Sequence, residues 1–165
     1  MNFLRTDSAT LKCELAGEVA RTFGEVRLRV LGTSMVPSLH PGDFISIQPS
    51  GLSEIEQGDI AVYSREGRLI AHRVVARAGS PEQPLLMLRG DRLRRNDSPV
   101  CSSELLGRVH FIERGDRRFA PSSKFSIWKR MIVLLLRCSD RATYVYLRLD
   151  ARRQGLFARR TECRV

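Results

Sequence analysis

Short strand-like segments recur between residues 25 and 113, with Gly, Pro, Ser or Asp between them. The first, "EVRLRVLGT", places Val26 and Leu28 on one side and Arg27 and Arg29 on the other, which is typical of a half-buried strand. The later segments are "DFISIQP", "GDIAVYS", "RLIAHRVVAR", "PLLMLRG" and "LLGRVHFIE". Many short strands at short intervals predict a mainly β body over residues 25–115.

A helical segment is expected before this body, at residues 1–24. Within it, Leu15, Val19 and Phe23 have the spacing of one helix face, and Gly24 would stop the helix.

Charge divides the chain into two parts. Residues 1–107 hold 13 Lys+Arg against 13 Asp+Glu, whereas residues 108–165 hold 15 against 5. A neutral domain with a basic tail is the pattern of an electrostatic attachment segment. We therefore assign residues 116–165 to a basic, helical C-terminal extension. Residues 125–149 form an amphipathic helix in this interpretation, which either lies on an anionic membrane surface or packs on protein with its arginines solvated.

Length and composition suit one compact domain with a small appendage, because the chain has 165 residues and 42% hydrophobic content. The four cysteines are far apart and form no CxxC pair, so neither a metal site nor a disulfide framework is indicated. No apolar window reaches about 18 residues, and residues 1–20 lack the apolar core of a secretion signal, so neither a membrane span nor a signal peptide is expected. The expected location is the cytoplasm, with peripheral attachment at the inner membrane surface as the alternative.

Ser34 stands between the first predicted strand and the turn-rich stretch "PSLHPGD". A serine needs a nearby general base to act as a nucleophile. No lysine lies in the strand-rich body after Ser34, so His72 in "LIAHRVV" is the better candidate. Each residue also has a purely structural interpretation: His72 as a hydrogen-bonded core residue, and Ser34 as the cap of a helical turn that begins at Met35.

Four blocks in order, "GTSMVPSLHPGD", "AHRVV", "LRGDRLRRND" and "LLGRV", resemble the signal peptidase I superfamily. They are most similar to the branch found in the endoplasmic reticulum, archaea and some Gram-positive bacteria, where a histidine replaces the usual lysine base. The resemblance covers residues 26 to about 113. It implies a folded β-sheet body, shared with self-cleaving LexA-type repressors, and a serine endopeptidase that cleaves a signal- or leader-like peptide.

Position by position, the resemblance makes Ser34 the nucleophile and His72 the general base. Asp97 matches the acid that orients the histidine and fixes its tautomer. Asp91 matches a second acid of the family, more plausibly structural. The chemistry of two aspartates six residues apart does not distinguish them, and only the resemblance favours Asp97.

Substrate binding is also implied by the resemblance. The oxyanion would be bound by the backbone N–H of Ser34 and by Thr33, because Gly32 stands where many relatives have a small hydroxyl residue. An extended peptide would add as a strand beside the nucleophile. Relatives prefer small residues before the cut, which implies shallow apolar pockets here, lined by Val30, Met35 and Ile70. No metal or organic cofactor is expected.

Two other functions stay open. Gly32 and the sequence "RLRR", where relatives usually carry an asparagine, would suit a module that holds a peptide without cutting it. A nucleic-acid-associated regulatory module would suit the basic third of the chain. Against it, the repressors use lysine as the base, and residues 1–24 are too short for a helix-turn-helix, so nucleic acid is the less favoured partner. The favoured partner is an extended peptide or preprotein.

Overall fold

A computed structural model describes residues 3–123, 133 and 143–149 of the chain. Most of the predicted C-terminal extension, including most of the amphipathic segment 125–149, lies outside the described residues. Residues 143–149 are helical. No helix in the described part of the chain is long and apolar enough to cross a membrane.

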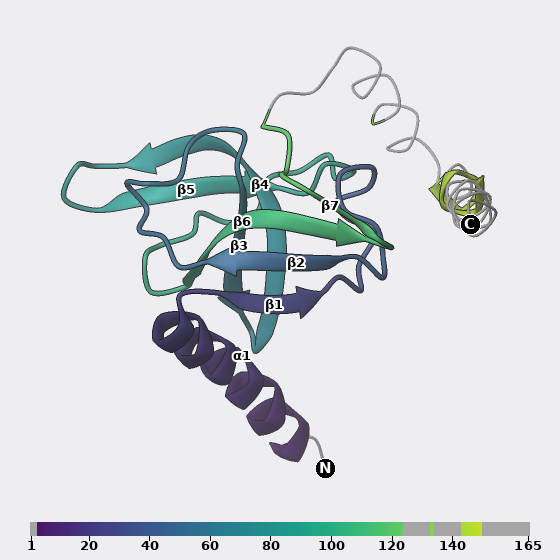
Figure 1. Cartoon of the computed structure of the whole chain (residues 1–165). Coiled ribbons are helices and arrows are strands. Elements are labelled where there is room, and N and C mark those ends of the chain that lie inside the picture. The colour runs from purple at the N-terminus through teal and green to yellow at the C-terminus, as the bar shows by residue number, and fades with distance from the viewer. Residues whose placement is uncertain (1–2, 124–132, 134–142, 150–165) are drawn as a thin grey trace.

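One antiparallel sheet of seven strands forms the body and confirms the mainly β fold. The strands follow helix α1 (Phe3–Phe23) in the order β1 (Val26–Arg29), β2 (Phe44–Gln48), β3 (Ile60–Arg65), β4 (Arg68–Gly79), β5 (Pro84–Arg89), β6 (Leu105–Arg114) and β7 (Arg117–Phe119). Their order in the sheet is β1-β2-β6-β3-β4-β5, and β7 pairs with β6. The sheet is folded over, so that β4 crosses behind β1, β2 and β6 (Figure 1).

Strand β3 contributes side chains to both hydrophobic cores of the folded sheet. It lies between β6 and β4 and is buried along most of its length. Because side chains alternate between the two faces of a strand, Ile60 and Val62 enter one core, and Ala61 and Tyr63 enter the other. This central position explains why β3 is buried on both faces rather than half-buried.

Helix α1 lies against β1 and β4 at one end of the sheet (Figure 1). The apolar residues that the sequence places on one face of this helix are mostly not its contact with the sheet, because Leu15 and Phe23 are 61% and 76% exposed and Val19 is half-buried. The helix instead buries Ala16 and Ala20. Small side chains allow the helix backbone to approach the strands closely, and this contact outweighs the pattern of larger residues.

The sequence did not predict β7, whose three residues are all exposed and show no apolar alternation. The strand forms because a two-residue turn, Gly115 and Asp116, returns the chain along β6. Gly115 has a positive φ of 57°, which glycine adopts without strain. The sheet therefore extends to Phe119.

Candidate active site

Ser34 lies in a tight turn that follows β1. The turn is closed by hydrogen bonds from the Val36 N–H to the Thr33 carbonyl (3.2 Å) and from the Leu39 N–H to the Met35 carbonyl (3.0 Å). Met35 and Leu39 are buried in the core and anchor the turn. The Ser34 hydroxyl points away from this turn, and its Oγ lies 3.0 Å from Nε2 of His72. It therefore contacts a histidine 38 residues later.

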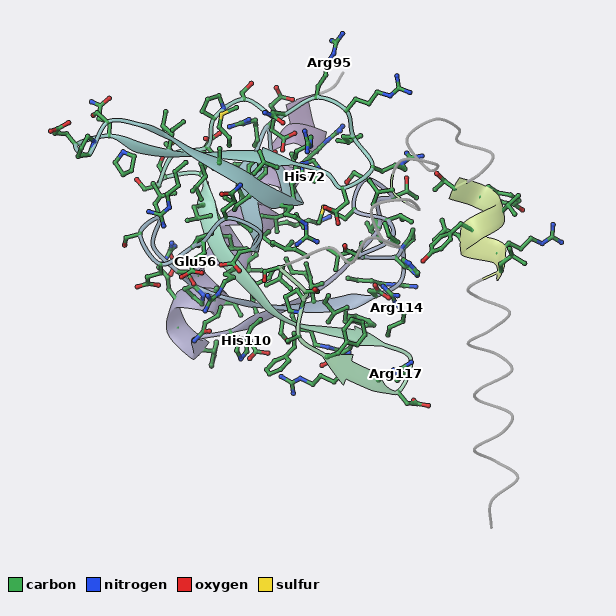
Figure 2. All side chains as sticks on the ribbon, turned by 90° about the horizontal axis from the view of Figure 1, so that it is seen from above. Glu56, His72, Arg95, His110, Arg114 and Arg117 are labelled. Atoms are coloured by element: carbon green, nitrogen blue, oxygen red, sulfur yellow. The ribbon has the colours of Figure 1, made fainter. Side chains whose placement is uncertain are left out.

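His72 lies in β4, where it is paired with Ala61 of β3, and its side chain is only 7% exposed. Figure 2 shows it inside the body. The other ring nitrogen, Nδ1, lies 2.6 Å from Oδ2 of Asp97. A carboxylate only accepts hydrogen bonds, so Nδ1 carries the hydrogen and Nε2 is left to accept one from the serine hydroxyl.

Asp97 is placed by the chain that follows β5. Its backbone N–H donates to the Leu88 carbonyl at 2.8 Å. Arg65 of β3 donates to the carbonyls of Ser98 and Pro99, both at 3.0 Å, and is paired with Glu104. The hydrogen bond from Arg65 is the main reason that the pKa of Glu104 is lowered. Arg65 thus ties the segment after Asp97 to the sheet.

Asp91 has a different partner. Arg73 donates from Nε to Oδ1 of Asp91 (2.8 Å) and from Nη2 to Oδ2 (3.0 Å), and both side chains are buried. Arg73 also donates to the Gly58 carbonyl at 2.6 Å and to Oγ of Ser38 at 3.0 Å. The pair therefore joins β4 to the turn that holds Ser34 and to the loop after β5.

Tyr63 is a site residue that the sequence reasoning missed. It is fully buried on β3, and its ring lies 6.4 Å from the ring of His72. Burial raises the pKa of Tyr63, and the charge of Asp97 and hydrogen bonding to that carboxylate raise it further. A buried tyrosine hydroxyl usually has a hydrogen-bond partner. No sequence signal marks Tyr63, because its contact with the site is made across the folded sheet.

Gly90 was also missed as a site residue, although it lies in the acidic block. A Cβ at this position would lie 2.9 Å from the Ser34 carbonyl oxygen and 3.0 Å from Nε2 of His72. The N–H of Arg92 donates to the same Ser34 carbonyl at 2.9 Å. The loop after β5 therefore packs directly on the serine and histidine, and only glycine fits at residue 90.

The Ser34 N–H makes no hydrogen bond within the part of the chain that the structure describes. Beside it, Oγ1 of Thr33 accepts a hydrogen bond from Nη2 of Arg92 at 3.2 Å, and Nη1 of Arg92 reaches Oγ1 of Thr143 at 3.2 Å. A Cβ at Gly32 would meet nothing within 4 Å. Backbone and side-chain donors are therefore both available next to Ser34.

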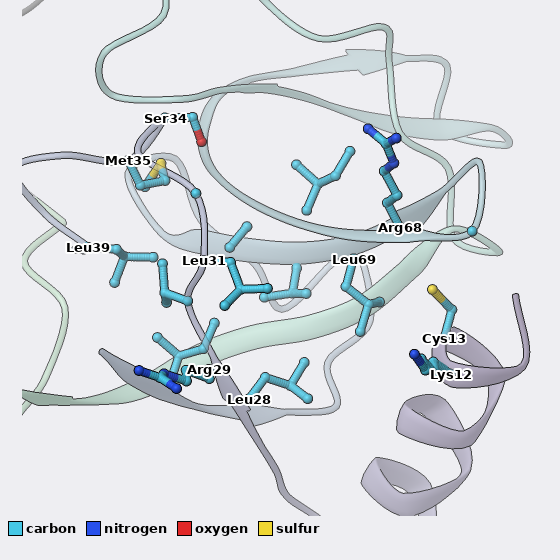
Figure 3. A pocket seen from close by; sticks show the side chains of 17 residues that line it. Lys12, Cys13, Leu28, Arg29, Leu31, Ser34, Met35, Leu39, Arg68 and Leu69 are labelled. Carbon is cyan, nitrogen blue, oxygen red and sulfur yellow. The ribbon is translucent and has the colours of Figure 1, made fainter. Parts of the chain in front are cut away.

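A pocket of about 660 Å³ opens beside Ser34, between β1, β4 and α1 (Figure 3). Its lining includes all three residues that the sequence assigned to a substrate groove, Val30, Met35 and Ile70. His40 and His110, to which the sequence assigned no function, lie elsewhere: His40 is buried against Tyr146, and His110 is exposed on β6 beside Phe111. The pocket and the Ser34, His72 and Asp97 contacts form one continuous site.

Residues 9–82 match the family model described as Peptidase S24-like. The match includes Ser34 and His72 and ends before Asp97. It supports the superfamily that unites S24-like and LexA-like proteins with signal peptidase I, in agreement with the broader resemblance of the four sequence blocks. The S24-like family includes serine peptidases. Comparison with curated proteins gives no match.

Proposed function

We propose that the protein is a serine endopeptidase in which Ser34 is the nucleophile, His72 the general base and Asp97 the orienting acid. The observation that carries this proposal is the line of contacts from Ser34 Oγ to His72 Nε2 (3.0 Å) and from His72 Nδ1 to Asp97 Oδ2 (2.6 Å). Both distances are short enough for hydrogen bonds and connect nucleophile, base and acid in the order that acyl transfer requires.

In the first half of the reaction, Ser34 Oγ attacks the scissile carbonyl carbon while His72 Nε2 takes the serine proton. The resulting imidazolium is stabilised by the Asp97 carboxylate. His72 then gives the proton to the departing amine, and the acyl group stays on Ser34. In the second half, His72 removes a proton from water, the hydroxide attacks the ester, and His72 returns the proton to Ser34 as the acid product leaves.

The negative charge on the substrate oxygen needs donors in place beforehand. The Ser34 N–H and the Thr33 hydroxyl are the candidates, because the first is not otherwise engaged in the described residues and the second stands beside it. Since Arg92 donates to the Thr33 oxygen, the threonine hydrogen is left for another acceptor. Each such donor typically contributes about 100-fold or more in rate.

An extended peptide can enter as an additional strand. β1 pairs with β2 along one edge, and residues 68–73 of β4 pair with β3, whereas β5 pairs with β4 only from Arg73 onward. The pocket therefore lies between two edges that have no strand partner within the described residues. Backbone hydrogen bonds to these edges would bind the peptide and present its carbonyl to Ser34.

The substrate that we propose is a signal- or leader-like peptide, such as a leader removed from a small ribosomal product, processed in the cytoplasm or at its membrane surface. The four ordered blocks around Ser34 and His72 support the histidine-containing branch of the signal peptidase superfamily. Attachment to an anionic membrane through residues 125–149 stays a prediction, because most of that segment lies outside the described residues.

The test is cleavage of a peptide library, read by mass spectrometry, with the purified protein and its Ser34→Ala and His72→Ala variants. We expect discrete cuts that both variants abolish. His110→Ala is the matched control, because this histidine is exposed on β6, and it should retain the wild-type cuts. Cuts that persist in Ser34→Ala would refute the proposed nucleophile.

A second function, peptide binding without cleavage, is favoured by Gly32, which leaves this position without a side-chain donor. It predicts that the wild-type protein binds a library peptide and leaves it intact. The same experiment separates the two functions, because binding is measured alongside cleavage.

A further inference from the structure

We propose that the pocket beside Ser34 selects peptides with a bulky apolar side chain next to the cleaved bond and acidic side chains farther along the same half of the peptide. This inference rests on the proposed function, because it assumes that Ser34 cleaves the bound peptide. It departs from the preference for small residues that the resemblance implies. It is carried by the size of the pocket, its apolar walls and its cations, which have no ion-pair partner among the described residues.

The size and lining of the pocket suit large side chains. A volume of about 660 Å³ lies within the range of about 300–1,000 Å³ that is typical of pockets for organic ligands. Side chains two residues apart on a strand share one face, so two side chains of an extended peptide can enter together. Leu28, Leu31 and Leu69 line the pocket, and Leu31 is 81% exposed. Bulky apolar residues would cover this surface, whereas alanine would leave much of it wet.

Three cationic side chains, Lys12, Arg29 and Arg68, also line the pocket, and no Asp or Glu is among its lining residues. None of the three makes an ion pair or side-chain hydrogen bond with any described residue. Other arginines of the body do find acidic partners: Arg27 pairs with Glu113, for example. The charge at the pocket is therefore a local excess.

This local excess is independent of the basic C-terminal third. Residues 1–107 hold equal numbers of acidic and basic side chains, and all three pocket cations belong to that balanced part. Charges that have no partner in the part of the chain that the structure describes can pair with a group of opposite sign on the ligand, which improves both encounter and specificity.

The layout of the pocket gives the order of the recognised residues. Ser34 and Met35 lie at one end, and Lys12 and Cys13 of α1 lie at the other, with the apolar side chains between them (Figure 3). The residue beside the scissile bond must lie at the Ser34 end. The apolar side chain therefore comes first, and acidic residues that contact Lys12 come later along the strand.

The experiment uses matched peptides that differ at two places. The first place is the residue next to the cleaved bond, which is either Leu or Ala. If the protein binds peptides without cleaving them, the consensus of the bound library peptides defines this place instead. A residue three to five positions away on the pocket side is Glu, Gln or Lys. Binding is measured with the Ser34→Ala protein, and cleavage with the wild type. We expect Leu with Glu to be best, with a preference of Glu over Lys of about two- to fivefold per charge at low salt and less at high salt.

Two variants test the assignment of the pocket. Lys12→Glu should weaken the preference for the Glu peptide over the Lys peptide, because only Arg29 and Arg68 then remain as pocket cations. Arg117→Glu, an equal change of charge on exposed β7, should leave the preference as it is. Val30→Phe narrows the apolar part and should shift the preference from Leu toward Ala. Circular dichroism and thermal unfolding confirm that each variant is folded before its preferences are compared.

The outcomes separate this inference from the proposed function. Equal binding of the Glu and Lys peptides to Ser34→Ala, or an unchanged preference in folded Lys12→Glu, would overturn the inference even if the protein cleaves. Selective binding of the Leu and Glu peptide with no cleavage by the wild type would support the inference and refute the peptidase.

Discussion

His72 Nδ1 lies 2.6 Å from Asp97 Oδ2, whereas Asp91 is bound by Arg73. Two aspartates six residues apart in one loop thus have separate partners. If Asp97 orients His72, Asp97→Asn should keep the fold and lower kcat by about 10⁴-fold, since an amide favours the wrong histidine tautomer. Steady-state kinetics and a thermal unfolding curve for the same sample test this.

Asp91→Asn is the matched comparison. Breaking a buried ion pair by removing one partner costs about 3–5 kcal/mol of unfolding free energy, because a charge stays buried. We therefore expect Asp91→Asn to lower the thermal stability strongly. The assignment of the two acids is contradicted if Asp91→Asn is as stable as the wild type and inactive, and Asp97→Asn is active.

Tyr63→Phe tests whether the buried tyrosine positions Asp97. The variant keeps the ring in the core and removes the hydroxyl that interacts with the carboxylate. Hydrogen bonds to charged groups contribute about 1.5–3 kcal/mol, so we expect kcat to fall about tenfold or more with KM nearly unchanged. Tyr146→Phe, whose ring packs edge-on against His40 rather than against His72, is the control and should retain kcat. An unchanged kcat in Tyr63→Phe would exclude the positioning role.

Gly90→Ala tests the close packing of the loop on the nucleophile. The added Cβ would lie 2.9 Å from the Ser34 carbonyl oxygen and 3.0 Å from His72 Nε2, so the loop or the two catalytic residues must shift. A displacement of this kind can cost about 100-fold in rate. At Gly51 the nearest atom to a new Cβ is Ser53 Oγ at 3.7 Å, so Gly51→Ala should leave kcat/KM intact. Equal activity of the two variants would contradict the geometry.

The sequence predicts those elements whose pattern lies in their own residues, and it misses those that depend on contacts with other parts of the chain. The alternation in "EVRLRVLGT" predicts β1, and the apolar run in "RLIAHRVVAR" predicts β4, because each signal lies within the residues of the strand itself. Strand β7 is missed because its pairing with β6 depends on the turn at Gly115, which brings together residues without an apolar pattern.

The candidate site shows the same limit. The sequence indicates Ser34, His72 and Asp97 through ordered blocks, and the fold brings these three side chains into contact. Tyr63 and Gly90 belong to the site through contacts across the folded sheet, which no spacing along the chain encodes. Likewise, the charge of the pocket becomes visible only when α1 brings Lys12 toward Arg68 of β4.

Stability should depend on pH through Glu104. Hydrogen bonding to Arg65 lowers the pKa of Glu104 in the folded protein, so the ionised form stabilises the fold. That contribution is complete above the pKa of the unfolded chain, about 4.3, and is lost as the pH falls through the lower folded value. Partial exposure limits it to about 1 kcal/mol. Thermal unfolding from pH 7 down to pH 3 should therefore show a smaller loss for Glu104→Gln than for the wild type. Identical pH profiles would contradict this role.

Gly32→Ser tests the oxyanion site by adding a group rather than removing one. A new Cβ at Gly32 meets nothing within 4 Å, and φ is not in the left-handed region, so the variant should fold normally. The hydroxyl introduced at residue 32 would supply a side-chain donor beside the Ser34 N–H. Many members of the signal peptidase superfamily, which the sequence resembles, have a small hydroxyl residue at this position. Because one such donor contributes about 100-fold, we expect kcat to rise by one to two orders of magnitude at unchanged KM. Gly32→Ala supplies the same Cβ without the hydroxyl and should match the wild type, and a rise in both variants would attribute the gain to backbone rigidity instead.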